Sequence, residues 1–297
     1  MNLQGVRDPS AEALGGPMVS WFVTPARGWL DVPRPRADTL WQTADGGRTW
    51  RQISNPLFSS FHFADASHGL AEVVTPDQRT ALEITRDGGV SWTPCDPPYG
   101  DILFDSIFLL DAQRGWAVVS ASEADWMGQT LVGEKEGPLR QGIMSSADGG
   151  CHWRPVWSSE RQISDSGELY FLDEANGWLT GGHLPGLQYT SDGGHSWRPL
   201  RFPDEKLHLK AVFFQDLAHG WSITSDEQTY ETADGGRTWR LLPRTEILSR
   251  LEELATAWGR WRIGKLYAML MRAGCFTPEE LKRQHRSTHH SHRDPGP

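Results

Sequence analysis

Five aspartates share one local sequence, and a carboxylate repeated in this way is the first candidate for chemistry in the chain. Each lies in an octapeptide of pattern S/T-x-D-G-G-x-x-W, called the box below; the five are Asp45, Asp87, Asp148, Asp192 and Asp234. A carboxylate can act as a general acid or base or bind calcium. Calcium loops, however, need acidic ligands at several alternating positions, and each box has one. Asp-Gly-Gly favours a turn in which the carboxylate accepts backbone N–H groups. We therefore expect structural aspartates, no metal site and no cofactor.

A tryptophan ends every box, and we expect it to begin a strand and to bury its ring against a neighbouring sheet. These residues are Trp50, Trp92, Trp153, Trp197 and Trp239. They account for a third of the 15 tryptophans in this hydrophilic chain. The repeated rings therefore predict repeated packing anchors.

A second element precedes each box, in which an apolar residue is followed by Asp at +2, Gly at +6 and Trp at +7. It is complete at Phe171/Asp173/Gly177/Trp178 and again from Phe214, while the third unit begins it with Leu109. The second unit has Leu70 in place of Trp, and the first has Thr24 in place of Asp. Two linked motifs in the same order five times indicate an internal repeat.

The repeat predicts an all-β fold: a β-propeller of about five four-stranded blades. In the last unit we expect strands at 211–215, 221–224, 228–232 and 239–242, separated by the turns of the two motifs. We assign residues 1–16 to an N-terminal extension and 17–243 to the propeller. The expected units are 17–54, 58–96, 104–157, 166–200 and 209–243. Closure with five blades is favoured because an open ring leaves edge strands exposed.

The combined motifs resemble those of the BNR or Asp-box propellers. They are most similar to the photosystem II stability and assembly factor family and its non-photosynthetic bacterial relatives. That resemblance covers roughly residues 17–243 and implies a scaffold that binds a protein, such as a membrane-complex subunit during assembly. The family implies about seven blades, whereas only five boxes are present. Similar boxes occur in sialidases, xyloglucan hydrolases and sortilin-type receptors, so the motifs specify fold rather than function.

Strand alternation places the turns of both motifs on one face of the ring, which leaves the non-repeated loops for the other face. Variable loops on a rigid scaffold are where recognition usually resides. Cationic candidates for a partner's acidic segment or carboxylate, and aromatic candidates for interface anchors, lie in or beside these loops. The candidates are Arg34, Arg36, Arg79, Trp126, Arg140 and Trp157. Solvated arginines and tryptophans packed under a long loop are the alternative interpretation.

A sialidase-like hydrolase is the enzymatic alternative, because sialidases share the box. It would need three arginines for the substrate carboxylate, a tyrosine nucleophile and an F/Y-R-I-P element, and no such element occurs. The tyrosines number five, and two of them, Tyr189 and Tyr230, stand just before boxes in expected strands. We therefore expect no catalytic residues; a sensory or adhesion module is a further alternative.

Residues 244–297 depart from the repeat and form a basic tail. They hold ten Lys and Arg against six Asp and Glu, which leaves 19 against 32 for residues 1–243. Ile247, Leu251, Leu254, Trp258 and Trp261 recur at helical spacing, so we expect a helical tail with a disordered His-rich end. The acidic body argues against nucleic-acid binding by the propeller.

The N-terminal sequence lacks the charged and apolar regions of a signal peptide, and no apolar run is long enough for a membrane helix. The chain as written is therefore expected in the cytoplasm, with an extracytoplasmic location as the alternative if its N-terminus is incomplete. Cys95, Cys151 and Cys275 are widely spaced and odd in number. We expect ordinary thiols rather than a disulfide framework.

Overall fold

The structure is a computed structural model. It describes residues 19–24, 26–32, 39–46, 48–54, 58–74, 80–95, 102–121, 140–158, 168–180, 186–203, 207–243 and 246–247. The N-terminal extension and nearly all of the predicted helical tail therefore lie outside the described residues. No helix in the described part is both long and apolar enough to span a membrane.

The described strands form five antiparallel sheets of four strands, which we number as blades in chain order. Blade 1 consists of β1 (Val19–Phe22), β2 (Gly28–Val32), β3 (Thr39–Thr43) and β4 (Arg51–Ser54). Blade 2 consists of β5 (Phe58–Phe63), β6 (Gly69–Val74), β7 (Thr80–Thr85) and β8 (Thr93–Pro94). Blade 3 consists of β9 (Leu103–Leu109), β10 (Gly115–Ala121), β11 (Arg140–Ser146) and β12 (Trp153–Ser158). Blade 4 consists of β13 (Glu168–Phe171), β14 (Gly177–Thr180), β15 (Leu187–Thr190) and β16 (Arg198–Leu200). Blade 5 consists of β17 (Leu209–Phe214), β18 (Gly220–Thr224), β19 (Thr229–Thr232) and β20 (Arg240–Leu242).

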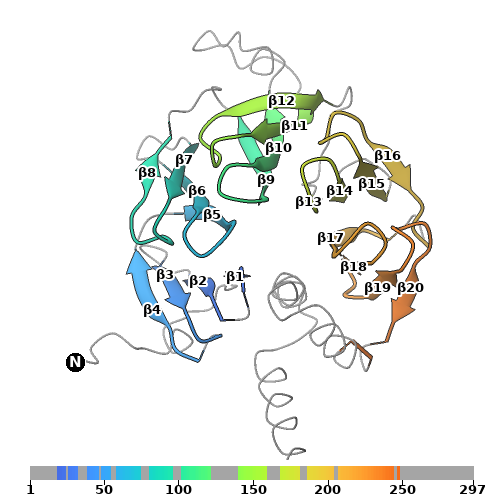
Figure 1. Ribbon diagram of the computed structural model, residues 1–297, viewed down its shortest axis with the longest axis horizontal. Coiled ribbons are helices and arrows are strands. Elements are labelled where there is room, and N and C mark those ends of the chain that lie inside the picture. The colour runs from blue at the N-terminus through green and yellow to red at the C-terminus, as the bar shows by residue number, and fades with distance from the viewer. Residues whose placement is uncertain are drawn as a thin grey trace, which may run out of the picture.

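The blades fan around a common axis, with the first strand of each blade innermost and the fourth outermost (Figure 1). The predicted all-β propeller of five four-stranded blades is thereby confirmed. The four strands expected in the last unit begin and end within two residues of the observed strands. Strand pairs were predictable there because short turns join consecutive strands and therefore set their register.

The apolar residue and the glycine of the second motif face each other across the first two strands of a blade. Phe171 pairs with Gly177, and Phe214 pairs with Gly220. A Cβ atom on Gly220 would lie 2.6 Å from the Phe214 ring. The glycine is therefore required because the aromatic ring lies directly over its backbone.

The aspartate of the second motif closes the turn between these strands. Asp216 Oδ1 accepts hydrogen bonds from the backbone N–H groups of Ala218 and His219, each at 2.8 Å. Thr24 performs the same task in blade 1, where its Oγ1 accepts hydrogen bonds from Ala26 and Arg27. The substitution of Thr for Asp is tolerated because a hydroxyl oxygen can cap the same turn.

The tryptophan of the second motif reaches into the next blade and stacks on its motif phenylalanine. The ring centroids of Trp29 and Phe63 are 3.6 Å apart, with an interplanar angle of 4°. The corresponding pairs Trp116–Phe171 and Trp178–Phe214 are separated by 3.9 and 3.8 Å. These stacks join blades 1 to 2, 3 to 4 and 4 to 5.

The junction between blades 2 and 3 is built differently. Leu70 and Leu109 occupy the Trp and Phe positions and pack in one buried cluster with Trp153. Cys95, directly after β8, forms a disulfide with Cys151 in the third box, with a Cα–Cα distance of 5.0 Å. The expectation of thiols was therefore wrong for these two residues. It failed because 56 residues separate them in sequence and only blade packing brings them together.

The ring-over-glycine packing predicts that Gly220→Ala destabilises the propeller. We expect a loss of about 1–3 kcal/mol in the free energy of unfolding, because the added methyl overlaps the Phe214 ring. Gly220 does not have a positive φ, so backbone strain adds nothing to this loss. Denaturant unfolding measures this loss. Ala233→Gly, at an exposed position in the fifth box, is the control and should cost less than about 1 kcal/mol. Equal effects of the two substitutions would contradict this account of the motif.

Candidate functional site

The two ends of each blade differ in composition, and the strand register defines them. In blade 1, Gly28 pairs with Thr43 at one end of the sheet and Val32 pairs with Thr39 at the other. We call the end that carries the boxes the box face and the opposite end the variable face. The two turns on the box face are hydrogen-bonded to each other: Gly235 N donates to Ala218 O at 2.8 Å, and the other blades repeat this bond. Both motifs therefore share one face, as strand alternation predicts.

The box aspartates are committed to their own turns. Asp234 Oδ1 accepts hydrogen bonds from Thr232 Oγ1 and Thr238 N, both at 2.9 Å, and its Oδ2 accepts one from Thr238 Oγ1 at 2.6 Å. The same three bonds recur at Asp45, Asp87 and Asp192. In the third box, His152 replaces the hydroxyl partner of Asp148. Both oxygens of each carboxylate thus hold a hairpin closed.

These bonds stabilise the ionised carboxylates. The hydroxyl of Thr238, followed by its backbone N–H, lowers the pKa of Asp234 from 3.8 to about 2. Ser196 does the same for Asp192, and Thr49 for Asp45, each to about 2. A general acid needs a raised pKa, so these carboxylates are tuned in the opposite direction. Their role in the turns is architectural.

A polar network on the variable face holds the base of the insertion in blade 3. Asp105 lies at a β-bulge in the inner strand β9, between the paired residues Phe104 and Ser106. Its Oδ2 accepts hydrogen bonds from Ser120 Oγ at 2.6 Å and from Gln141 Nε2 at 3.0 Å. These donors lie in β10 and β11, next to the two ends of the segment 122–139. The carboxylate therefore fixes the strands from which that segment departs.

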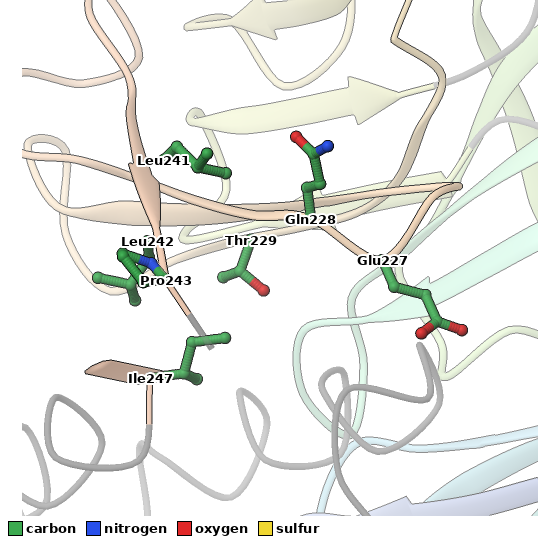
Figure 2. A pocket seen from close by; sticks show the side chains of 7 residues that line it. All are labelled: Glu227, Gln228, Thr229, Leu241, Leu242, Pro243 and Ile247. Atoms are coloured by element: carbon green, nitrogen blue, oxygen red, sulfur yellow. The ribbon is translucent and has the colours of Figure 1, made fainter. Parts of the chain in front are cut away.

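A pocket of about 280 Å³ lies on the variable face of blade 5, beside the turn between β18 and β19 (Figure 2). Thr224 organises this turn: its carbonyl accepts Glu227 N and its Oγ1 accepts Gln228 N, both at 3.0 Å. Glu227 is the one described non-glycine residue with a positive φ, at 64°. The pocket is lined by Glu227, Gln228, Thr229, Leu241, Leu242, Pro243 and Ile247. It therefore combines an acidic and amide rim with an apolar wall.

Among the candidate partner-binding residues, only Trp157 has a described side chain. It is half-buried and packs against the cluster between blades 3 and 4 that contains Phe108 and Leu179. Arg140 is placed by its backbone, opposite Ala121 in the pairing of β10 and β11. Arg34, Arg36, Arg79 and Trp126 lie outside the described residues. The proposed binding role of all six stays a prediction.

Sequence reasoning overlooked an exposed arginine that follows the box tryptophan in four of the five blades. These residues are Arg51, Arg154, Arg198 and Arg240, all on outermost strands. Arg240 donates to Glu231 at 2.6 and 2.9 Å, and the Arg198 guanidinium lies 4.6 Å from the centre of the Tyr189 ring. A long cation on an edge strand discourages pairing with another chain, which explains these residues without a ligand. The repeated Trp-Arg dipeptide was the signal that identified them in retrospect.

No family model matches the chain, and no curated protein matches it. Among solved structures it is similar to YCF48 bound to D1 peptide, with 16% identity and a TM-score of 0.47 over 72% of this chain and 63% of that chain. It is also similar to YCF48 from Cyanidioschyzon merolae, with 19% identity and a TM-score of 0.46 over 73% and 66% of the two chains. The GH74 enzyme of Niastella koreensis has 13% identity and a TM-score of 0.49, over 80% of this chain and 38% of that chain. The chain thus spans less than two thirds of these proteins' lengths.

The lowered aspartate pKa values predict acid sensitivity of the propeller. A folded-state pKa of about 2 against an ordinary value of 3.8 means that the box turns contribute fully above about pH 5 and lose this contribution as the pH falls towards 2. Thermal melts between pH 7 and pH 2 measure this loss.

Thr238→Val tests the cause of the shift. The substitution removes the hydroxyl that lowers the pKa of Asp234 most, so the aspartate should titrate at a higher pH in a carboxyl-carbon NMR titration. Ser225→Ala, which removes an exposed hydroxyl outside the box, is the control and should leave the pKa of Asp234 unchanged. An Asp234 that titrates near 3.8 in the native wild-type protein would disprove the turn-locking role.

Proposed function

We propose that this protein is a noncatalytic propeller scaffold that binds a protein partner through its variable face. One observation carries the proposal: the repeated carboxylates and hydroxyls are committed to turns on the box face, whereas the Asp105 network and the pocket beside Glu227, which do not recur, lie at the opposite end of the described blades. A fold that holds its repeated groups in this way leaves recognition to the irregular loops.

The described part of the variable face has the composition of a recognition surface. Leu103 at the start of β9 and Leu241 beside the pocket are about half exposed, as are Val90 and Leu217 on the box face, so the pocket beside Glu227 is what distinguishes the variable face. Apolar side chains next to the carboxylate of Glu227 and the amide of Gln228 provide both buried area and directional contacts. The Asp105 network gives the neighbouring insertion a rigid base. These features support binding of an extended segment rather than turnover of a substrate.

We propose a segment of a membrane-complex subunit as the partner, which is the class that the family resemblance implies. In the similar YCF48 structure, the YCF48 protein is bound to a D1 peptide. For this chain, the arginines of the variable loops, Arg34, Arg36 and Arg79, favour an acidic segment or a terminal carboxylate because guanidinium groups bind carboxylates in two-point geometry.

Charge reversal on the two faces tests the proposal. The double variant R34E/R36E alters the segment between β2 and β3, two strands that meet on the variable face, and R48E/R237E alters two exposed arginines in boxes as a matched control. Tagged proteins purified from lysate of the native host are compared by quantitative mass spectrometry. We expect one protein to be recovered equally with wild type and the control. It should be recovered about tenfold less with R34E/R36E, because charge reversal removes the charge complementarity with the partner; tenfold corresponds to about 1.4 kcal/mol of binding free energy. Melting curves check that both variants fold. Equal recovery with all three would exclude these arginines as partner contacts.

A fluorogenic sialoside assay of the wild type and of the double variant R34A/R36A tests the enzymatic alternative. The scaffold proposal expects no turnover by wild type. Turnover that disappears in R34A/R36A would instead favour a sialidase-like hydrolase, because such an enzyme binds the substrate carboxylate through arginines.

A further inference from the structure

The Cys95–Cys151 disulfide lies at a position that corresponds to a packing contact at two other junctions. At the junctions of blades 1 to 2 and 4 to 5, the third residue after a box tryptophan packs against the second box glycine of the next blade. Ile53 Cδ1 lies 3.1 Å from the Cβ position of Gly89, and Leu200 Cδ1 lies 3.0 Å from that of Gly236. Cys95 occupies this place in blade 2, and Cys151 directly follows the second glycine of the third box. The ring geometry therefore brings the two sulfurs together.

The disulfide occurs at the one described junction that lacks the aromatic stack. Leu70 and Leu109 replace the Trp and Phe rings there, and leucine buries less apolar area than either ring. At the junction of blades 3 and 4, by contrast, Trp116 stacks on Phe171 and its Nε1 donates to Gly193 O at 2.9 Å. Leucine can offer neither interaction. A covalent bond thus takes the place of the strongest noncovalent contact between blades.

We propose that the junction of blades 2 and 3 is a redox-controlled latch, closed by the disulfide and loosened by its reduction. Cys95 is buried, at 6% exposure, whereas Cys151 is partly exposed, so a dithiol reductant attacks the Cys151 sulfur. A mixed disulfide forms, and Cys95 leaves as a thiolate that takes up a proton. The second thiol of the reductant then releases Cys151 as a thiol. Two electrons pass to the protein, and the reductant becomes a disulfide.

The latch links the state of the ring to the compartment. Disulfides persist in oxidising compartments and are reduced by dithiol systems in the cytosol, so the closed form belongs to an oxidising environment. The disulfide lies at the box end of blade 3, because Cys151 belongs to the third box, whereas Asp105 lies on the variable face of the same blade. Loosening therefore acts on the two blades that the bond joins.

Peptide mapping and melting curves of the full-length protein test the bond. Digestion without reductant should yield a linked Cys95–Cys151 peptide and an alkylated Cys275. Reduction should lower the melting temperature by about 4–16 °C, the range expected for one disulfide in a domain of this size, and re-oxidation should restore it. Cys151→Ser should have the melting temperature of the reduced wild type, and reductant should not change it. The control Cys275→Ser should show the same decrease in melting temperature on reduction as the wild type. A protein without the linked peptide, or whose melting temperature does not respond to reductant, overturns the latch.

Hydrogen exchange of the reduced wild type tests whether the effect is local, without any substitution. Reduction should increase deuterium uptake in segments 80–95 and 102–121, on the two sides of the junction. Segments 207–224 and 229–242, which form blade 5 away from this junction, are the internal control and should change little. An equal increase in all blades would mean that the disulfide only stabilises the whole propeller, and would overturn the proposal of a local latch.

Discussion

The packing of one phenylalanine per junction organises most of this molecule. At the junctions that have it, the ring lies over a glycine of its own blade, carries the tryptophan of the preceding blade on its face and meets the box tryptophan of its own blade at its edge. An aromatic ring that buries about 150–250 Å² contributes roughly 4–6 kcal/mol at about 25 cal/mol per Å². A turn hydrogen bond contributes about 1 kcal/mol. Each stack between blades therefore contributes more than any single turn hydrogen bond, and the turns set its geometry.

This constraint explains why the repeated residues are where they are. A four-stranded sheet has two apolar faces and cannot bury both alone, so each blade requires neighbours. The tryptophan that leaves one blade and the phenylalanine that receives it must recur in step, together with the glycine that makes room. The box supplies the second contact, because its last residue meets the same phenylalanine. Substitution at one position is therefore matched across the junction, as Leu70 and Leu109 demonstrate.

The same constraint leaves the two faces of the propeller unequally free to vary. The box face is occupied by turns whose side chains bond to one another, so it has little freedom to vary. On the variable face, the described loops need no such repeated hydrogen bonds between turns. Asp105, the pocket beside Glu227 and the exposed Leu103 all lie there, and none of them recurs in every blade. A protein that evolves new partners on this scaffold can change those residues without disturbing the stacks.

The amino-acid sequence by itself determined the blades, their strands and the structural role of the box aspartates. These follow from interactions within about five residues, such as Thr238 with Asp234, and from the repetition of those interactions. Only the tertiary structure decided which cysteines meet, that Asp105 binds Ser120 and Gln141, and that Trp157 packs between two blades. The partners in these contacts come from different strands or blades, up to 56 residues apart, and no repeat marks them. Their meeting depends on how the blades are placed around the axis, which local pattern cannot specify.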